Sequence, residues 1–151
     1  MRLVLFSLAA AMLASTPAFA DGARVEVQGG AGWSDDGSAK GVIGGAAGYD
    51  WSLPGGAFVG VEESIDKTIG SHRDARWATS GRVGLHISPS DKLYATAGYN
   101  YGQGPNGTDV GAGLEHSFAG PIYGKVEYKH YFNEDYARDS NAVLTGVGLH
   151  F

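Results

Sequence analysis

The fold is decided by a pattern that is clearest in residues 75–87, which read ARWATSGRVGLHI. Alternate residues from Ala75 through Trp77 and Val83 to Ile87 are mostly apolar, whereas the residues between them include two arginines and a histidine. Successive side chains of a β-strand point to opposite faces of the sheet. The alternation therefore predicts a strand with one apolar face and one polar face.

The same alternation occurs in eight stretches, each about ten residues long. They are residues 22–33, 41–51, 57–66, 75–87, 93–102, 110–118, 121–132 and 141–151. This length fits a tilted strand that crosses a bilayer, about 9–11 residues, and exceeds the usual globular strand of about 5–6 residues. The 25 glycines follow no collagen-like repeat and are accompanied by many aromatic residues, so the chain does not read as a disordered linker.

The connections between these stretches alternate in length. Three are short turns, at 52–56, 88–92 and 119–121, and four are longer and polar, at 34–40, 67–74, 103–109 and 133–140. Short turns at one end and longer loops at the other are typical of an outer-membrane barrel, with the turns in the periplasm.

The two faces of the strands decide between a membrane barrel and a soluble sandwich or lipocalin-type barrel, which would turn its apolar face inward. The polar faces carry nearly balanced charges, as expected of side chains that pair inside a narrow barrel, where an unpaired charge is costly. This interior set is Arg24, Glu26, Glu62, Arg76, Arg82, Glu115, Lys125, Glu127 and Lys129.

Aromatic residues on the apolar faces gather near strand ends, as in the aromatic girdles of membrane barrels. They are Trp33, Tyr49, Trp51, Trp77, Tyr99, Tyr101, Phe118 and Phe132.

The chain ends mid-pattern on an aromatic residue, with Val147, Leu149 and Phe151 on one face. This tail resembles the C-terminal signal that bacterial outer-membrane proteins present to their barrel-assembly machinery. Residues 125–148 resemble the last hairpin of the opacity-type and OmpA-like surface barrels. The resemblance implies an all-β fold, an eight-stranded antiparallel transmembrane barrel, and carries no activity, because that family is functionally varied.

The first 20 residues predict a secretory signal peptide. Arg2 precedes a mostly apolar run that ends at Leu13, and Ala18-Phe19-Ala20 fits a cleavage site after Ala20. Domain organisation is thus a signal peptide, 1–20, and a barrel domain, 21–151, exported to the outer membrane of a Gram-negative bacterium.

The chain has no cysteine and a formal net charge of −5. These values exclude a disulfide framework and argue against nucleic acid as a partner.

The function that we expect is non-enzymatic, either structural and envelope-stabilising or adhesive, without cofactor or metal. Expected partners are outer-membrane lipids and lipopolysaccharide, the assembly machinery, and a host or cell-surface ligand on the outer loops, with the chain a monomer. One alternative is a narrow pore, and another is a soluble periplasmic ligand binder. A third is a lipid A-modifying enzyme that uses His130 with Ser140 and Glu134 or Asp135. The His-x-Ser spacing of lipid A deacylases is absent, because Phe132 occupies the serine position.

Three smaller features remain. His86 and His150 have the inward parity and predict hydrogen bonds inside the barrel. Acidic pairs in two longer loops, including Asp35-Asp36, are usually solvated, although carboxylates also suit Ca²⁺ and Mg²⁺. Glu63 has the outward parity of its apolar neighbours, so it lies at the membrane interface or a bulge near Ser64 shifts the register.

Overall fold

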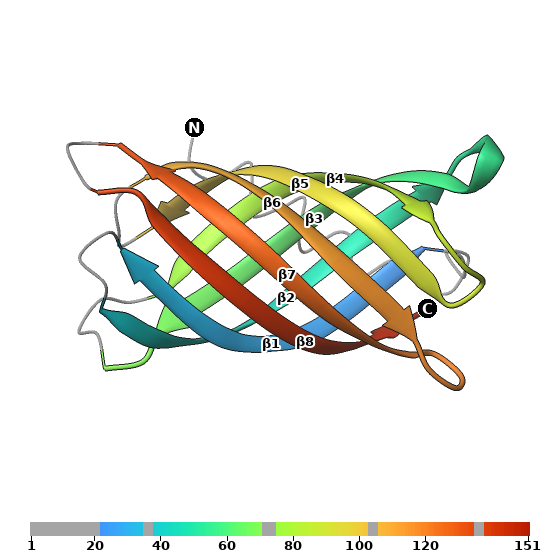
Figure 1. The fold of residues 1–151 in the computed structure, drawn as a ribbon, viewed down its shortest axis with the longest axis horizontal. Coiled ribbons are helices and arrows are strands. Elements are labelled where there is room, and N and C mark those ends of the chain that lie inside the picture. Colours follow the sequence, from blue (N-terminus) through green and yellow to red (C-terminus); the bar gives the residue numbers. More distant parts are fainter. Residues whose placement is uncertain (1–21, 35–37, 71–74, 103–105, 135–137) are drawn as a thin grey trace.

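The structure is a computed structural model that describes residues 22–34, 38–70, 75–102, 106–134 and 138–151. Antiparallel strands form a closed barrel in which each strand pairs with the next and β8 pairs with β1 (Figure 1). The strands are β1 (Ala23–Ser34), β2 (Ala39–Ser52), β3 (Ala57–Thr68), β4 (Arg76–His86), β5 (Asp91–Gly102), β6 (Gly107–Ser117), β7 (Ile122–Asn133) and β8 (Ser140–His150). The predicted eight-stranded, all-β antiparallel barrel is therefore confirmed. The predicted signal peptide, residues 1–20, lies outside the described residues.

Six of the seven predicted connections were too long, because strands extend into them, and two of these errors involve interior residues. Residues 91 and 92 belong to β5 and residues 107–109 to β6, although the sequence placed them in a turn and a loop. Polar and glycine-rich turn chemistry concealed the strand ends there. As a consequence, Lys92 and Asp109 are strand residues.

The apolar face of each strand points away from the barrel axis. Val27 is 70% exposed and Val83 is 56% exposed, whereas Arg24 is 1% exposed and Glu127 is fully buried. Charged side chains thus fill the middle, and the apolar side chains form the outer surface. No helix among the described residues is long and apolar enough to cross a membrane.

Large aromatic side chains fit inside the barrel because each lies against a glycine on the neighbouring strand. Phe58 pairs with Gly84, Tyr94 with Gly113 and Tyr123 with Gly148. A Cβ atom added to Gly84 or Gly148 would lie 2.6 Å from the facing ring, and one added to Gly113 would lie 2.5 Å from it. The glycines on the inward faces therefore make the space that the rings occupy.

The ends of the barrel differ. The short connections after β2, β4 and β6 lie at the same end as the C-terminus (Figure 1). They are built as tight turns: Gly55 and Gly56, with φ of 80° and 78°, belong to the 3₁₀ turn Pro54–Gly56, and Gly120 has φ of 69°. Positive φ is a conformation that glycine adopts without steric cost.

The register of β3 settles the position of Glu63. Pairing with β2 runs without interruption from Val42↔Thr68 to Ser52↔Phe58, so no bulge occurs near Ser64. Glu63 therefore faces outward. Its Oε1 accepts a hydrogen bond of 2.5 Å from Thr79 Oγ1, and its Oε2 accepts one of 3.3 Å from the hydroxyl of Tyr101.

Candidate functional site

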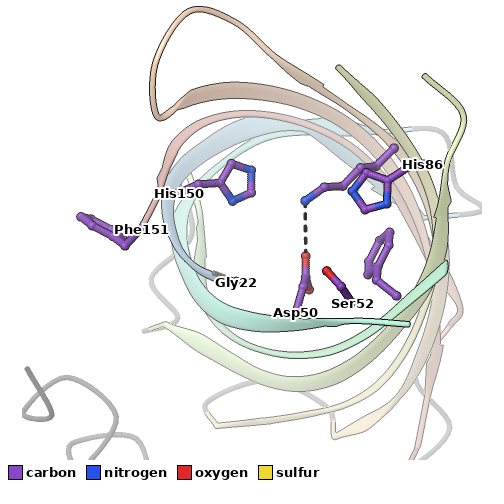
Figure 2. Close-up of a pocket in the computed structure, with 8 residues that line it drawn as sticks. Gly22, Asp50, Ser52, His86, His150 and Phe151 are labelled. Atoms are coloured by element: carbon purple, nitrogen blue, oxygen red, sulfur yellow. Dashed lines mark ion pairs between the residues drawn. The ribbon is translucent and has the colours of Figure 1, made fainter. Parts of the chain in front are cut away.

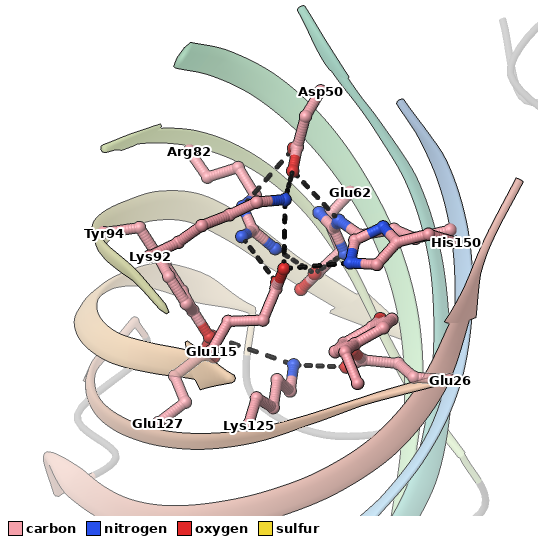
Figure 3. A network of polar contacts seen from close by, with 12 residues as sticks. Glu26, Asp50, Glu62, Arg82, Lys92, Tyr94, Glu115, Lys125, Glu127 and His150 are labelled. Atoms are coloured by element: carbon pink, nitrogen blue, oxygen red, sulfur yellow. Dashed lines mark hydrogen bonds and ion pairs between the residues drawn. The ribbon is translucent and has the colours of Figure 1, made fainter. Parts of the chain in front are cut away.

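Two arginines and three carboxylates form a layer across the barrel interior (Figure 3). Arg24 Nη1 lies 2.7 Å from Glu62 Oε2, and Arg82 Nη2 lies 3.0 Å from Glu115 Oε2. Asp50 stands between the two guanidinium groups, with its oxygens 3.6 Å from Arg24 Nε and 3.4 Å from Arg82 Nε. All five side chains are buried, so each charge is neutralised by the others rather than by bulk water.

Two lysines of β7 extend this layer along the barrel. Lys125 Nζ pairs with Glu26 and lies 3.7 Å from Glu127 Oε2. Lys129 Nζ lies 3.3 Å from Glu127 Oε1 and 4.0 Å from Asp109 Oδ2. Of these pairs, Lys125 with Glu26 connects β7 to β1, which are far apart in the sequence.

Two tyrosines complete the bonding of the carboxylates. The hydroxyl of Tyr94 donates to Glu127 Oε2 at 2.7 Å, and the hydroxyl of Tyr123 donates to Glu26 Oε2 at 2.6 Å. The guanidinium carbon of Arg82 lies 4.0 Å from the centre of the Tyr94 ring, within range of a cation–π interaction. We call this set of ion-paired and hydrogen-bonded side chains the interior network. It consists of Arg24, Glu26, Asp50, Glu62, Arg82, Lys92, Tyr94, Asp109, Glu115, Tyr123, Lys125, Glu127, Lys129 and His150.

Eight of the nine charged residues that the sequence predicted for the interior belong to this network, and Arg76 does not. Its Nη2 donates to Asn133 Oδ1 at 3.0 Å, and its guanidinium lies 4.7 Å from the centre of the Tyr131 ring. In the described part of the chain, Arg76 has no ion pair with a carboxylate. At the start of β4, the amide oxygen of Asn133 and the ring of Tyr131 thus contact the guanidinium instead of a carboxylate.

The sequence-based prediction of interior residues did not name five members of the network, which are Asp50, Lys92, Tyr94, Asp109 and Tyr123. Lys92 and Asp109 were assigned to connections, whereas His150, which was expected to meet a glutamate inside the barrel, is hydrogen-bonded to Glu115. Asp50 has the inward parity of β2, one residue before Trp51, and this signal was available. For Lys92 and Asp109 the missing information was the exact ends of the strands.

The interior network ends in an open cavity at the short-turn end of the barrel (Figure 2). This cavity, which we call the vestibule, has a volume of about 290 Å³. Its polar lining comes from Asp50, Ser52, His86, Lys92 and His150. Lys92 Nζ and His150 Nε2 each lie 3.0 Å from Glu115 Oε1, and His86 Nδ1 is hydrogen-bonded to Gly56 O at 3.0 Å. The floor of the vestibule is therefore the layer of arginines and carboxylates.

His130 lies on the outer surface, near the longer connections. Its Nδ1 is hydrogen-bonded to Asn141 Oδ1 at 2.8 Å, and its Nε2 lies 3.9 Å from Asp139 Oδ2. Ser140, the nucleophile of the enzyme alternative, instead accepts a hydrogen bond from Asn133 Nδ2. Asp135 lies outside the described residues, and Glu134 has a backbone hydrogen bond to Asn106 O. The structure therefore does not bring His130 and Ser140 together as a base and its nucleophile.

The predicted interface aromatics all lie on outward positions, seven of them within strands and Phe118 directly after β6. Five are well exposed: Trp51, Trp77, Tyr99, Phe118 and Phe132. The other three, Trp33, Tyr49 and Tyr101, are half-buried. Val147, Leu149 and Phe151 also point outward, at the end of β8. Asp35 and Asp36 lie outside the described residues, and within those residues no three His, Asp or Glu side chains converge as a metal ion would require.

A closed antiparallel barrel with an apolar exterior, aromatic residues toward both ends and a charged interior defines an outer-membrane β-barrel. The chain belongs to the family described as the outer membrane protein beta-barrel domain, whose model matches residues 6–151. Membership places the protein in the outer membrane and confirms the resemblance that its last strands suggested.

Solved structures share this fold at low sequence identity. Neisserial surface protein A is 12% identical, with a TM-score of 0.59 over 85% of this chain and 96% of that one. Ail, the attachment invasion locus protein of Yersinia pestis, is 13% identical, with a TM-score of 0.60 over 86% and 97%. The N-terminal barrel domain of Pseudomonas aeruginosa OprF is 17% identical, with a TM-score of 0.53 over 85% and 97%. No curated protein matches the chain.

Proposed function

We propose that this protein is a closed outer-membrane barrel that stabilises the envelope and does not conduct solutes. The observation that carries the proposal is the interior network, whose ion pairs cross the barrel interior between strands that are not neighbours, for example β1 with β3, β4 with β6 and β7 with β3. Phe58, Tyr94, Tyr123 and Leu144, each at most 3% exposed, fill the space beside it. Opening a path would require separating several buried ion pairs at once, and each unpaired buried charge is costly.

The short outer connections support a structural role over an adhesive one. No connection at the end opposite the short turns exceeds seven residues, the length of 69–75 between β3 and β4. Such connections offer little surface for a host receptor. The apolar outward side chains of every strand, by contrast, are exposed where lipid surrounds the barrel. Outer-membrane lipids and lipopolysaccharide are therefore the partners that we propose.

Recognition by the barrel-assembly machinery belongs to the same proposal. Val147, Leu149 and Phe151 point away from the interior along the last strand, so their side chains are accessible before the barrel meets lipid. The orientation that we propose, with the short turns in the periplasm, follows the layout of bacterial outer-membrane barrels.

The test is the conductance of the refolded protein in planar lipid bilayers. We expect no discrete current steps from the wild-type barrel. A double variant, Arg82→Ala with Glu115→Ala, removes both partners of one central ion pair and should introduce steps, which shows that the assay detects an opened interior. Stable steps from the wild-type protein would contradict the proposal.

The envelope role has its own test in cells. Deletion of the gene should increase the sensitivity of the outer membrane to detergent, and the wild-type gene should restore resistance. Unchanged sensitivity would remove the stabilising role while leaving the closed barrel intact.

A further inference from the structure

The outer surface is hollowed across β8, β1 and β2. The hollow is a groove of about 440 Å³, lined on its outward side by Val27, Gly29, Ile43, Thr145 and Val147, with Ile69 at its rim. Its lining is largely apolar, and it faces the hydrocarbon rather than the barrel interior. We call it the lipid-facing groove.

The register of the strands explains why the surface is concave here. Thr145 of β8 pairs with Gly29 of β1, Gly29 pairs with Ile43 of β2, and Ile43 pairs with Lys67 of β3. Because Gly29 has no side chain, the backbone forms the surface between the side chains of Thr145 and Ile43. Val27, which also lines the groove, pairs with Gly45 of β2, another outward position without a side chain.

A cationic side chain stands beside the groove. Lys67 is exposed and directly opposite Ile43, one residue before the end of β3 that is farther from the short turns. In the described part of the chain, none of the ion pairs includes Lys67. A lysine near a membrane interface extends its ammonium toward headgroups and attracts anionic lipids.

We propose that the lipid-facing groove binds one acyl chain of a phosphorylated glycolipid of the outer leaflet, with Lys67 contacting a phosphate. The proposal rests on the orientation proposed above, which places Lys67 on the side of the outer leaflet. Charge complementarity favours this occupant over a zwitterionic lipid. A flexible acyl chain also fits a hollow better than a second copy of the barrel, since a two-fold interface would place two concave surfaces face to face.

Native mass spectrometry of the refolded barrel in mild detergent tests the groove. The probes are purified diphosphorylated lipid A and phosphatidylcholine, each added at equal concentration. We expect lipid A to remain bound to the wild-type barrel and phosphatidylcholine to be lost. Equal retention of the two lipids would overturn the proposal.

Two variants with matched controls locate the binding. Gly29→Val fills the groove, and a Cβ atom at Gly29 would lie no closer than 3.4 Å to other atoms. Gly81→Val adds the same side chain to an outward glycine of β4, where the nearest atom is 3.9 Å away. We expect Gly29→Val to lower lipid A binding by about tenfold, the factor lost when roughly two methylenes are no longer buried. Gly81→Val should leave binding unchanged, and an equal loss in both variants would overturn the proposal.

The charge is tested in the same way. Lys67→Gln should lower lipid A binding by about fivefold, the contribution of one lysine near a charged membrane surface. Arg138→Gln removes a positive charge from an exposed residue before β8 and should have no effect. If Lys67→Gln has no effect either, the phosphate contact is wrong.

The same mass spectra show whether a second copy of the barrel occupies the groove instead of a lipid. A dimer that Gly29→Val dissociates would show that another barrel occupies the groove, and the proposal would be wrong. The conductance of the wild-type barrel is measured separately, so a failure of lipid binding would not contradict the proposal that the barrel is closed. Current steps would reject the closed barrel without bearing on the groove.

Discussion

Glu62 and Glu63 are adjacent in the sequence and lie on opposite sides of the barrel wall. Glu62 is buried, with Arg24 at 2.7 Å, Arg82 at 3.9 Å and Lys129 at 4.0 Å from its oxygens. Glu63 faces outward and is held by the hydroxyls of Thr79 and Tyr101. The carboxylate of Glu62 is thus neutralised by cations inside, whereas that of Glu63 is hydrogen-bonded by neutral hydroxyls outside. The comparison indicates that the interior tolerates carboxylates only in balance with cations.

The largest effect should come from removing the inner carboxylate. Glu62→Ala removes the carboxylate 2.7 Å from Arg24 and leaves this arginine with Asp50 at 3.6 Å, and breaking a buried ion pair in this way costs about 3–5 kcal/mol. Equilibrium urea unfolding of the refolded barrel in lipid, followed by tryptophan fluorescence, measures the loss. A change below about 1 kcal/mol would show that water already screens the interior, and the contrast between the two glutamates would disappear.

The next effect concerns size rather than charge. Gly148→Val places a side chain against the Tyr123 ring inside the barrel, and overpacking of this kind costs about 1–3 kcal/mol. Gly81→Val, outside, should change the free energy of unfolding by no more than about 0.5 kcal/mol. The same unfolding experiment compares them. Equal effects would mean that the interior is loosely packed.

A third pair separates inner from outer hydroxyls. Tyr94→Phe removes the donor to buried Glu127 and should cost about 1–3 kcal/mol, because a charged acceptor loses its bond. Tyr128→Phe removes the exposed hydroxyl that donates to Asn141 Oδ1, and we expect a loss within about 0.5 kcal/mol. If the outer variant proves the more damaging, hydrogen bonds on the lipid side matter more than burial indicates.

The smallest effect should come from Glu63→Gln. The amide keeps a hydrogen-bonding oxygen for Thr79 and removes a charge from the lipid-facing surface, where charged residues are unfavourable. We expect a change of less than about 1 kcal/mol, in the stabilising direction. A clear destabilisation would indicate that Glu63 has a cationic partner in the membrane.

The faces of the strands were predictable because alternation has a period of two and a bilayer requires long strands. Glu26 and Lys125 could be placed inside on this basis alone. Their contact could not be predicted, since it depends on how β7, β8 and β1 align after closure. The hydrogen bond from Tyr123 to Glu26 spans 97 residues. Local turn chemistry misled the prediction at Lys92 and Asp109, where polar residues continue the strand instead of ending it.

The contacts of Glu26 also constrain how the protein reaches its final form. Glu26 belongs to the first strand, and its partners Lys125 and Tyr123 belong to the seventh, so they meet only when the first and last strands join. Before this seam closes, Glu26 lacks both partners, and Lys125 keeps Glu127 of its own strand, 3.7 Å away. Hydrocarbon disfavours an unpaired carboxylate, so a partly closed intermediate in the membrane is unstable and insertion becomes an all-or-none step.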